Sequence, residues 1–200
     1  MHYAVLELLG DVSIRQSTRE RLIDTALMMF MKHGFNSVGL DRILNEVGVT
    51  KTTFYNHFES KEQLAIDSLH RRVELDRLIF TQFIVESVGP DPCQQMLAIF
   101  DVLDAYFNDE RFVGCIFIKA CAEFPEPSDP IHRVASGFFA WLGQHIQGLA
   151  TQAEHPDPKG LAQTWVMLIQ GAISQRLILT DPHAAKRAKV LAEGVLGGSA

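Results

Sequence analysis

The stretch LDRILNEVGVTKTTFYNHF, residues 40–58, decides the fold of this chain because it predicts two short helices joined by a tight turn. The first helix has an apolar face whose residues recur at i, i+3, i+4 and i+7, namely Leu40, Ile43, Leu44 and Val47. Gly48 can adopt the left-handed backbone conformation that ends a helix. Thr50 is a favourable N-cap for the helix that follows. This pattern is typical of a helix-turn-helix.

The second helix, predicted over residues 51–57, buries Phe54 together with Phe58 and carries polar side chains on its other face. These side chains supply a cation, hydroxyl groups, an amide and an imidazole, from Lys51, Thr52, Thr53, Tyr55, Asn56 and His57. Such groups can reach base edges and phosphates in the major groove of DNA. A purely structural helix would more usually show Glu, Lys and Ala outside. We therefore interpret this face as DNA-binding; two packed helices with a glycine between them are the alternative.

Residues 18–64 resemble the DNA-binding domain of the TetR family of bacterial transcriptional regulators. The resemblance rests on HGF at 33–35, on the helix-turn-helix stretch and on SKEQL at 60–64. The rest of the chain resembles the family only in its helical layout. Val38-Gly39 stands where the family usually has Thr-Thr or Thr-Ser, so a hydroxyl group that would contact a phosphate is missing.

The resemblance implies a sequence-specific regulator, expected to be a repressor. Lys51, Thr52 and Thr53 are expected to face bases, and Lys51 is best suited to guanine acceptors. The family pattern assigns phosphate contacts to Tyr55, His57 and Lys61. Lys61 lies in the first turn of the next helix, where backbone N–H groups and a cation can hold a phosphate together.

The charge distribution fits a DNA-binding end on an acidic body. The net charge of the 200 residues is −6, yet residues 15–61 carry seven cations and five anions, a net +2. The rest carries eleven cations and nineteen anions, a net −8. The three cysteines, Cys93, Cys115 and Cys121, lack metal-ligand spacing and are expected to be reduced and mostly buried. No apolar run reaches the roughly 18 residues that span a bilayer, and no signal peptide is evident, so a cytoplasmic protein is expected.

The expected fold is all-α, in three parts: a mobile arm at 1–16, a helix-turn-helix domain at 17–64 and a helical ligand-binding and dimerisation domain at 65–200. Ser17 with Glu20, and Ser60 with Gln63, predict capping boxes. The second opens a long helix that runs to about residue 87. Four Asp-Pro pairs combine an N-cap with a favoured first helical residue. They predict helices near 92–108, 130–150, 158–180 and 182–196, and a further helix fits between 110 and 122.

The helical body is predicted to bind a ligand and to dimerise. Apolar stripes on the helices near 158–180 and 182–196 permit the four-helix dimer interface of the family, and a C2 dimer would match a near-palindromic operator. Aromatic residues on the middle helices favour an apolar cavity, although such stripes are more often core. The candidate lining is Phe100, Leu103, Phe107, Phe117, Cys121, Trp141, His145, Met167 and Gln170. The effector should be small, hydrophobic, and neutral or weakly charged.

Other classes of protein are less well supported by the sequence. An enzyme is disfavoured because HxxxH, HExxH, CxxC, GxSxG, P-loop and GxGxxG patterns do not occur. Neither a cofactor nor a metal is predicted. A helical interaction or ligand-binding module without DNA binding is the alternative function, and it would show no salt-sensitive binding to duplexes.

Overall fold

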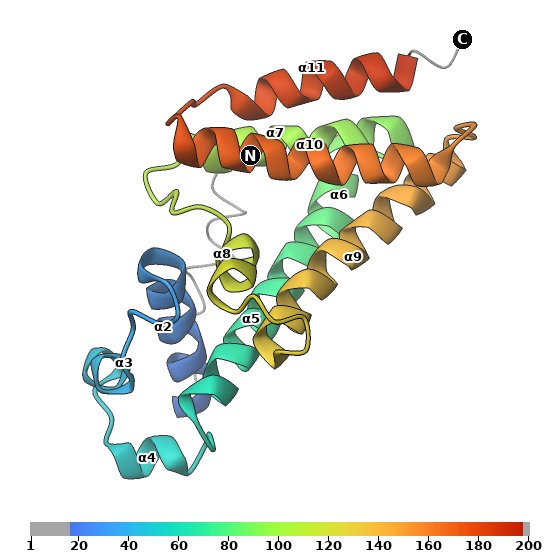
Figure 1. The fold of residues 1–200 in the computed structure, drawn as a ribbon. Coiled ribbons are helices and arrows are strands. Elements are labelled where there is room, and N and C mark those ends of the chain that lie inside the picture. The colour runs from blue at the N-terminus through green and yellow to red at the C-terminus, as the bar shows by residue number, and fades with distance from the viewer. Residues whose placement is uncertain (1–16, 198–200) are drawn as a thin grey trace. The chain divides into compact units, whose positions relative to one another are not determined.

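The computed structural model describes residues 17–197, and within that range every regular element is a helix (Figure 1). The elements are α2 (Thr18–His33), α3 (Leu40–Val47), α4 (Lys51–Tyr55), α5 (Lys61–Leu78), η1 (Ile79–Phe83), α6 (Ile84–Val88), α7 (Pro92–Phe107), α8 (Ile116–Glu123), α9 (Pro130–Gln152), α10 (Pro158–Ile178) and α11 (Ala184–Gly197). The all-α prediction is confirmed. The predicted arm at 1–16 lies outside the described residues.

The chain forms two compact units. Unit 1 contains the described residues up to Arg77 together with Cys115–Phe138, and unit 2 contains Leu78–Gly114 and the described residues from Phe139 onward. α5 and α9 each pass from one unit into the other, since the divisions at 77/78 and 138/139 fall inside them. The helix-turn-helix therefore shares its unit with α8, which is distant in sequence.

Local capping sets the ends of the helices around the helix-turn-helix. The Ser17 hydroxyl accepts from the Glu20 N–H and the Glu20 carboxylate accepts from the Ser17 N–H, so the predicted capping box opens α2. Gly48 ends α3 in the left-handed conformation, with φ 75° and ψ 41°. Thr50 then caps α4 by accepting from the Thr53 N–H at 3.1 Å. α4 is shorter than predicted and ends at Tyr55.

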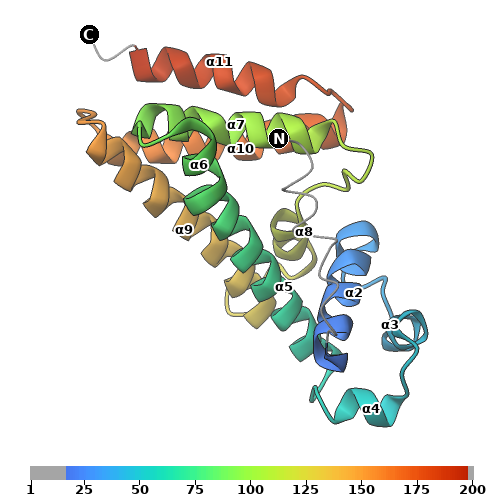
Figure 2. The ribbon, with the colours of Figure 1, turned by 180° about the vertical axis from the view of Figure 1, so that it is seen from behind.

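The helices α2, α3 and α4 of unit 1 are seen from behind in Figure 2, and aromatic side chains are a large part of the core of this unit. Phe30 stacks on Phe35 with ring centroids 4.8 Å apart, and Phe54 stacks on Phe58 at 5.5 Å. All four rings are buried. Burying a side chain of this size contributes about 1.5–3 kcal/mol. Phe54 and Phe58, which the sequence predicts to be buried together, thus anchor α4 in the core of the unit.

The long helix predicted from residue 60 to about 87 is present but irregular. The Ser60 hydroxyl accepts from the Gln63 N–H at 3.0 Å, whereas the Gln63 amide donates to Asp67 instead of closing a capping box. The helix widens into the π-helical segment η1 and resumes as α6 before Gly89 ends it with φ 79°. Such segments insert an extra residue into a helical turn.

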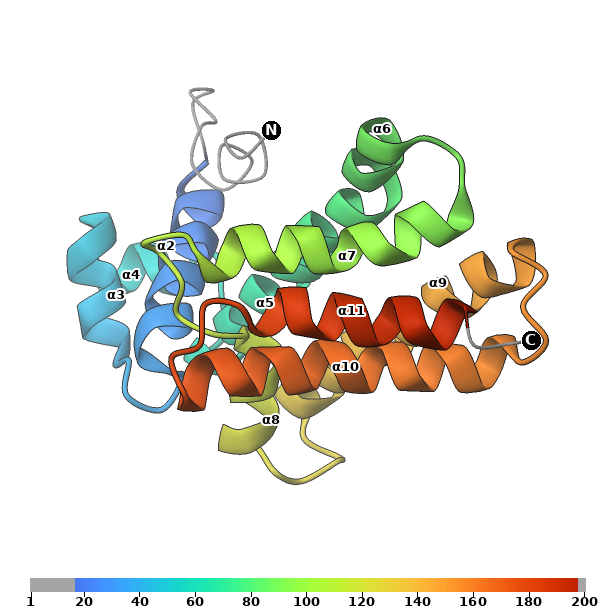
Figure 3. The ribbon, with the colours of Figure 1, turned by 90° about the horizontal axis from the view of Figure 1, so that it is seen from above.

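In unit 2, α7, α10 and α11 lie side by side (Figure 3). Trp165 is fully buried and donates its indole N–H to the Met96 carbonyl at 3.2 Å. α11 packs through a face of small residues, namely Ala184, Ala185, Ala188 and Ala192. Lys189 adds an ion pair with Asp101 of α7 at 2.7 Å. Small side chains on α11 allow it to approach its neighbours closely, while its larger apolar residues remain outside.

The Asp-Pro pairs correctly predicted three helix starts, at Pro92, Pro130 and Pro158. The fourth helix starts at Ala184 rather than at 182: residues 182 and 183 form a turn, and Asp181 accepts from the His183 N–H. The helix predicted between 110 and 122 begins only at Ile116. Asp109 holds the Arg111 N–H in a local turn, and Gly114 has φ 89°, which no right-handed helix accommodates.

The cap at Thr50 generates a prediction about stability. Replacing Thr50 by Ala removes the acceptor of the Thr53 N–H and should lower the free energy of unfolding by about 1 kcal/mol. Thr52→Ala is the matched control, because Thr52 is exposed on the same helix and does not cap it. Chemical denaturation followed by circular dichroism measures both. Equal losses for the two variants would contradict a role for the cap.

Candidate nucleic-acid interface

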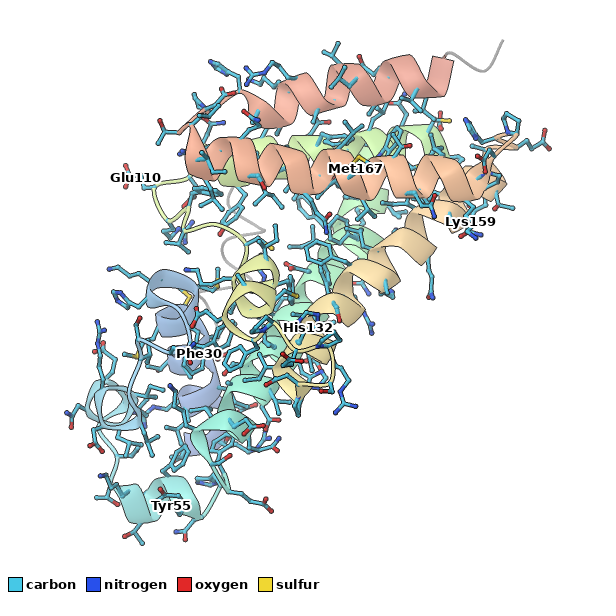
Figure 4. The ribbon with its side chains drawn as sticks, viewed as in Figure 1. Phe30, Tyr55, Glu110, His132, Lys159 and Met167 are labelled. Atoms are coloured by element: carbon cyan, nitrogen blue, oxygen red, sulfur yellow. The ribbon has the colours of Figure 1, made fainter. Side chains whose placement is uncertain are left out.

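The polar face of α4 is open to solvent. Phe54 is fully buried, whereas Tyr55 is 58% exposed and projects from the helix (Figure 4). Lys51, Thr52, Asn56 and His57 are also exposed. Thr53 differs, because it is half-buried and its hydroxyl lies 2.9 Å from that of Thr50 in the cap. Five of the six candidates between residues 51 and 57 are therefore exposed: Lys51, Thr52 and Tyr55 on α4, and Asn56 and His57 directly after it.

Lys51 has a partner in the free protein. Its ammonium lies 2.9 Å from the Asp41 carboxylate, which belongs to the first turn of α3. The hydrogen bond that the ammonium donates to Asp41 and the negative charge of that carboxylate raise the pKa of Lys51. Lys51 is therefore fully protonated at neutral pH. The pair joins the two helices of the motif, and sequence inspection missed it because the residues lie ten positions apart on different helices.

Lys61 points inward. Its ammonium donates to the Phe35 carbonyl at 2.6 Å and lies 5.9 Å from the centre of the Phe30 ring. Burial lowers the pKa of Lys61, an effect that the charge of Glu123 opposes. One of the three ammonium donors is thus committed to the α2–α3 turn, whereas the sequence pattern suggested a phosphate contact. In this structure Lys61 supports the motif from within.

The α2–α3 turn is also held from α8. The Glu123 carboxylate accepts from the N–H groups of Phe35 and Asn36 at 3.1 and 2.7 Å. Lys119, one turn earlier on α8, donates to the Met31 carbonyl at 2.6 Å. A Cβ atom at Gly34 would collide with the Glu123 carboxylate, so this close approach needs a glycine there. We call Lys61, Lys119 and Glu123 the turn clamp.

Two arginines in the first turn of α2 have partners within unit 1. Arg19 pairs with Asp67 and lies 5.2 Å from the centre of the Phe58 ring. Arg21 donates to the Val47 carbonyl at 2.5 Å, at the C-terminal end of α3. Both residues therefore stabilise the motif. Their cationic groups face protein acceptors, which a sequence pattern alone does not reveal.

The departure at residues 38–39 has a structural explanation. Val38 is fully buried, and Gly39 is the N-cap of α3 without a side-chain hydrogen bond. The hydroxyl expected from the family pattern is thus absent, as the sequence indicated. Only backbone N–H groups at the start of α3 face outward for an anion there.

The candidate ligand residues fall in both units. In unit 2, Phe100 and Phe107 are buried, while Leu103, Trp141, His145 and Gln170 are half-buried. Trp141 stacks on His145 at 5.4 Å and contacts Phe80 at 6.0 Å, and burial lowers the pKa of His145. In unit 1, Phe117 stacks on Phe138 at 4.1 Å, and Cys121 is half-buried.

Met167 does not behave as a cavity residue. Its side chain is 69% exposed on the outer side of α10 (Figure 4). The position of Met167 along α10 fits the apolar period of the helix, but residues on the outward face of α10 follow the same period. We therefore correct this candidate: within one chain, Met167 belongs to the surface of α10.

The cysteines are less enclosed than expected. Cys93, Cys115 and Cys121 are free and each is partly exposed, although burial of its thiol raises the pKa of Cys115 to about 11. Across residues 17–197, no cluster of three or more His, Cys, Asp or Glu side chains is arranged to hold a metal. Among the described helices, none has the length and apolar character needed to cross a membrane.

Known proteins with similar sequences also contain a helix-turn-helix and are named as transcriptional regulators. The sequence profile described as "Bacterial regulatory proteins, tetR family" matches residues 22–67. The transcriptional regulator YjdC of Escherichia coli is 24% identical over 178 residues, 89% of this chain and 93% of that protein. The transcriptional repressor NemR of E. coli is 27% identical over 135 residues, 65% of this chain and 67% of that protein. These relatives are transcriptional regulators, not enzymes.

A solved structure extends the similarity to nearly the whole chain. SCO4454, a TetR-family transcriptional regulator from Streptomyces coelicolor, is 32% identical, with a TM-score of 0.83 and coverage of 90% of this chain and 94% of that one. The reduced form of E. coli NemR shares the fold, with a TM-score of 0.81 at 22% identity over 89% of this chain and 96% of that one. This chain therefore belongs to the TetR family of bacterial transcriptional regulators and is a DNA-binding transcriptional regulator.

Proposed function

We propose that this protein is a homodimeric repressor that binds a near-palindromic operator and is released from it by a small, uncharged, hydrophobic effector. The observation that carries the proposal is the exposed polar face of α4, held in place by the buried Phe54. Several relatives are named as repressors, which supports the sign of regulation. We place the protein in the cytoplasm, where bacterial chromosomal DNA lies. Residues 17–64 would bind DNA, and residues 65–200 would bind the effector and dimerise.

Exposed apolar side chains support dimerisation through α10 and α11. On α10 and the residue after it, Ile178 is 77% exposed, and Met167, Leu177 and Leu179 are also exposed. On α11, Val190 is 65% exposed, with Leu191 and Val195 exposed beside it. Apolar side chains gathered in this way mark interaction surfaces. A C2 dimer would set two copies of α4 about 34–36 Å apart, one turn of DNA.

Residues of unit 2 support the proposed class of effector. The ring stack of Trp141 and His145 presents aromatic faces, and burial keeps the imidazole neutral by lowering its pKa. Phe100 and Leu103 of α7 add apolar surface in the same unit. Among these residues the polar groups are few and uncharged, which favours a small hydrophobic ligand oriented by one or two hydrogen bonds.

The turn clamp supplies a physical route from effector to DNA. Lys119 and Glu123 lie on α8 and grip the turn that leads into α3. α8 follows directly on a chain crossing from unit 2, at 114/115, and α9 returns the chain to unit 2. A ligand that favours a displaced α8 would loosen the α2–α3 turn and lower affinity for the operator. Such coupling requires that the effector bind the two states with different affinity.

Selection of bound fragments from random duplexes tests DNA binding itself. We expect a near-palindromic consensus and an affinity that falls linearly with the logarithm of salt concentration. Lys51→Gln should weaken operator binding by about five- to 150-fold and relax the preference at one base pair. Lys159→Gln, the same charge change at an exposed site on α10, is the control. A protein that retained no duplex at low salt would refute the proposed function.

The dimer is tested by placing a charge in the apolar stripe. Ile178→Glu should shift the mass measured by sedimentation from about twice 22.4 kDa to the mass of one chain. Gln144→Glu adds the same carboxylate at an exposed position of α9, outside the proposed dimer surface, and should leave the dimer intact. A wild-type protein that sediments as one chain at micromolar concentration would contradict the assembly.

The turn clamp is tested at Glu123. Glu123→Gln keeps the size of the side chain but removes the charge that strengthens two hydrogen bonds, a change on the order of 1–3 kcal/mol. We expect faster hydrogen exchange at the Phe35 and Asn36 amides, measured by NMR, and weaker operator binding. Glu126→Gln, an exposed residue just after α8, is the control. Faster exchange with unchanged operator affinity would limit the clamp to a structural role.

A further inference from the structure

We propose that Asp41 is a specificity-determining residue, which holds the Lys51 ammonium in the free protein and releases it only where base acceptors take its place. The proposal starts from the ion pair between the two helices of the motif, 2.9 Å from nitrogen to oxygen. It rests on the proposed contact of Lys51 with bases and adds a residue to which neither the family pattern nor the comparisons give a role.

Folding stability does not account for this pair. The side chains of Lys51 and Asp41 are 63% and 71% exposed, and ion pairs that exposed contribute little to stability. Arg19 is also exposed and paired, with Asp67, but it lies at the start of α2. Lys51 is the paired cation that begins α4, the helix proposed to contact bases. We therefore expect the ion pair between Lys51 and Asp41 to affect DNA binding.

The location of Asp41 strengthens the argument. The residue lies in the first turn of α3, after an N-cap glycine without a side-chain hydrogen bond. The exposed N–H groups at such a helix start attract anions, phosphates among them. Asp41 places a carboxylate at that end and next to Lys51. A phosphate of unselected DNA that approached either the start of α3 or the Lys51 ammonium would thus meet the negative charge of Asp41.

The pair should reduce binding to random DNA more than binding to the operator. Binding to unselected sequences comes almost entirely from phosphate contacts, and a lysine neutralised by Asp41 offers them little. At the operator, the O6 and N7 acceptors of guanine can replace the carboxylate, and this contact discriminates between bases. Separating an exposed pair costs up to about 1 kcal/mol, so the exchange is favourable only where the new contact of Lys51 returns more than that.

The test compares affinities for the selected operator and for a scrambled duplex over a series of salt concentrations. Asp41→Asn should raise affinity for the scrambled duplex by about three- to tenfold. Its salt dependence should steepen by about one phosphate contact. Operator affinity should rise less, so the operator-to-scrambled ratio falls. Asp41→Ser, which also suits a helix start, provides a second variant without the carboxylate.

Two controls separate this effect from a simple change of net charge. Glu46→Gln removes one negative charge from an exposed site on the same helix and should leave the ratio unchanged. In a Lys51→Gln background, Asp41→Asn should no longer alter the ratio. The inference is overturned if Asp41→Asn raises both affinities by the same factor as Glu46→Gln. It is also overturned if operator affinity alone falls, since Asp41 would then itself contact a base.

Failure of the inference is distinguishable from failure of the proposed function. A wild-type protein that does not prefer its selected operator to the scrambled duplex refutes the function. A wild-type protein that discriminates well, with an unaltered ratio in both Asp41 variants, refutes only the role of Asp41.

Discussion

α4, the second helix of the helix-turn-helix, is too short to be stable alone, and its stability depends on the residues around it. α4 has five residues, Lys51–Tyr55, whereas isolated helices are marginal below about 12–15 residues. Its conformation comes from the Thr50 cap at one end and from Phe54, which is buried and stacked on Phe58. The polar groups of α4 are therefore usable only because an aromatic ring on its opposite side is anchored in unit 1. The proposed DNA-binding residues and the buried Phe54 thus belong to the same short helix.

Several charged side chains of unit 1 form hydrogen bonds with backbone groups of the same unit. Lys61, Lys119 and Glu123 all end on main-chain groups between Met31 and Asn36. Arg21 does the same at Val47. Peptide groups in the last turns of α2 and α3 and in the turn after α2 lack partners within a helix. These side chains supply the hydrogen bonds that buried or half-buried polar groups require. These hydrogen bonds leave the charges of Lys61, Lys119 and Arg21 in place, but they commit donors that a phosphate would otherwise use.

Sequence reasoning succeeded where the signal was local. The capping box at Ser17, the left-handed Gly48 and the cap at Thr50 each depend on residues within four positions, and all three are present. It could not identify partners that come from far along the chain. Lys61 follows the family motif, yet its ammonium meets the Phe35 carbonyl, 26 residues away. Met167 matches the apolar period of a core stripe, and only the packing of α10 shows that it faces outward. The candidate ligand residues were chosen by composition, which cannot assign them to one unit.

The π-helical segment bears on how this chain is compared with its relatives. Ile79–Phe83 accommodates one residue more than a regular α-helix of the same height, and it does so between two helical stretches that keep their own caps at Ser60 and Gly89. A relative with an unbroken helix would thus be one residue shorter here, and the alignment gap would belong inside a helix, where gaps are seldom placed. Without that gap, every side chain beyond the segment would be assigned to a helical face about 100° away from its own.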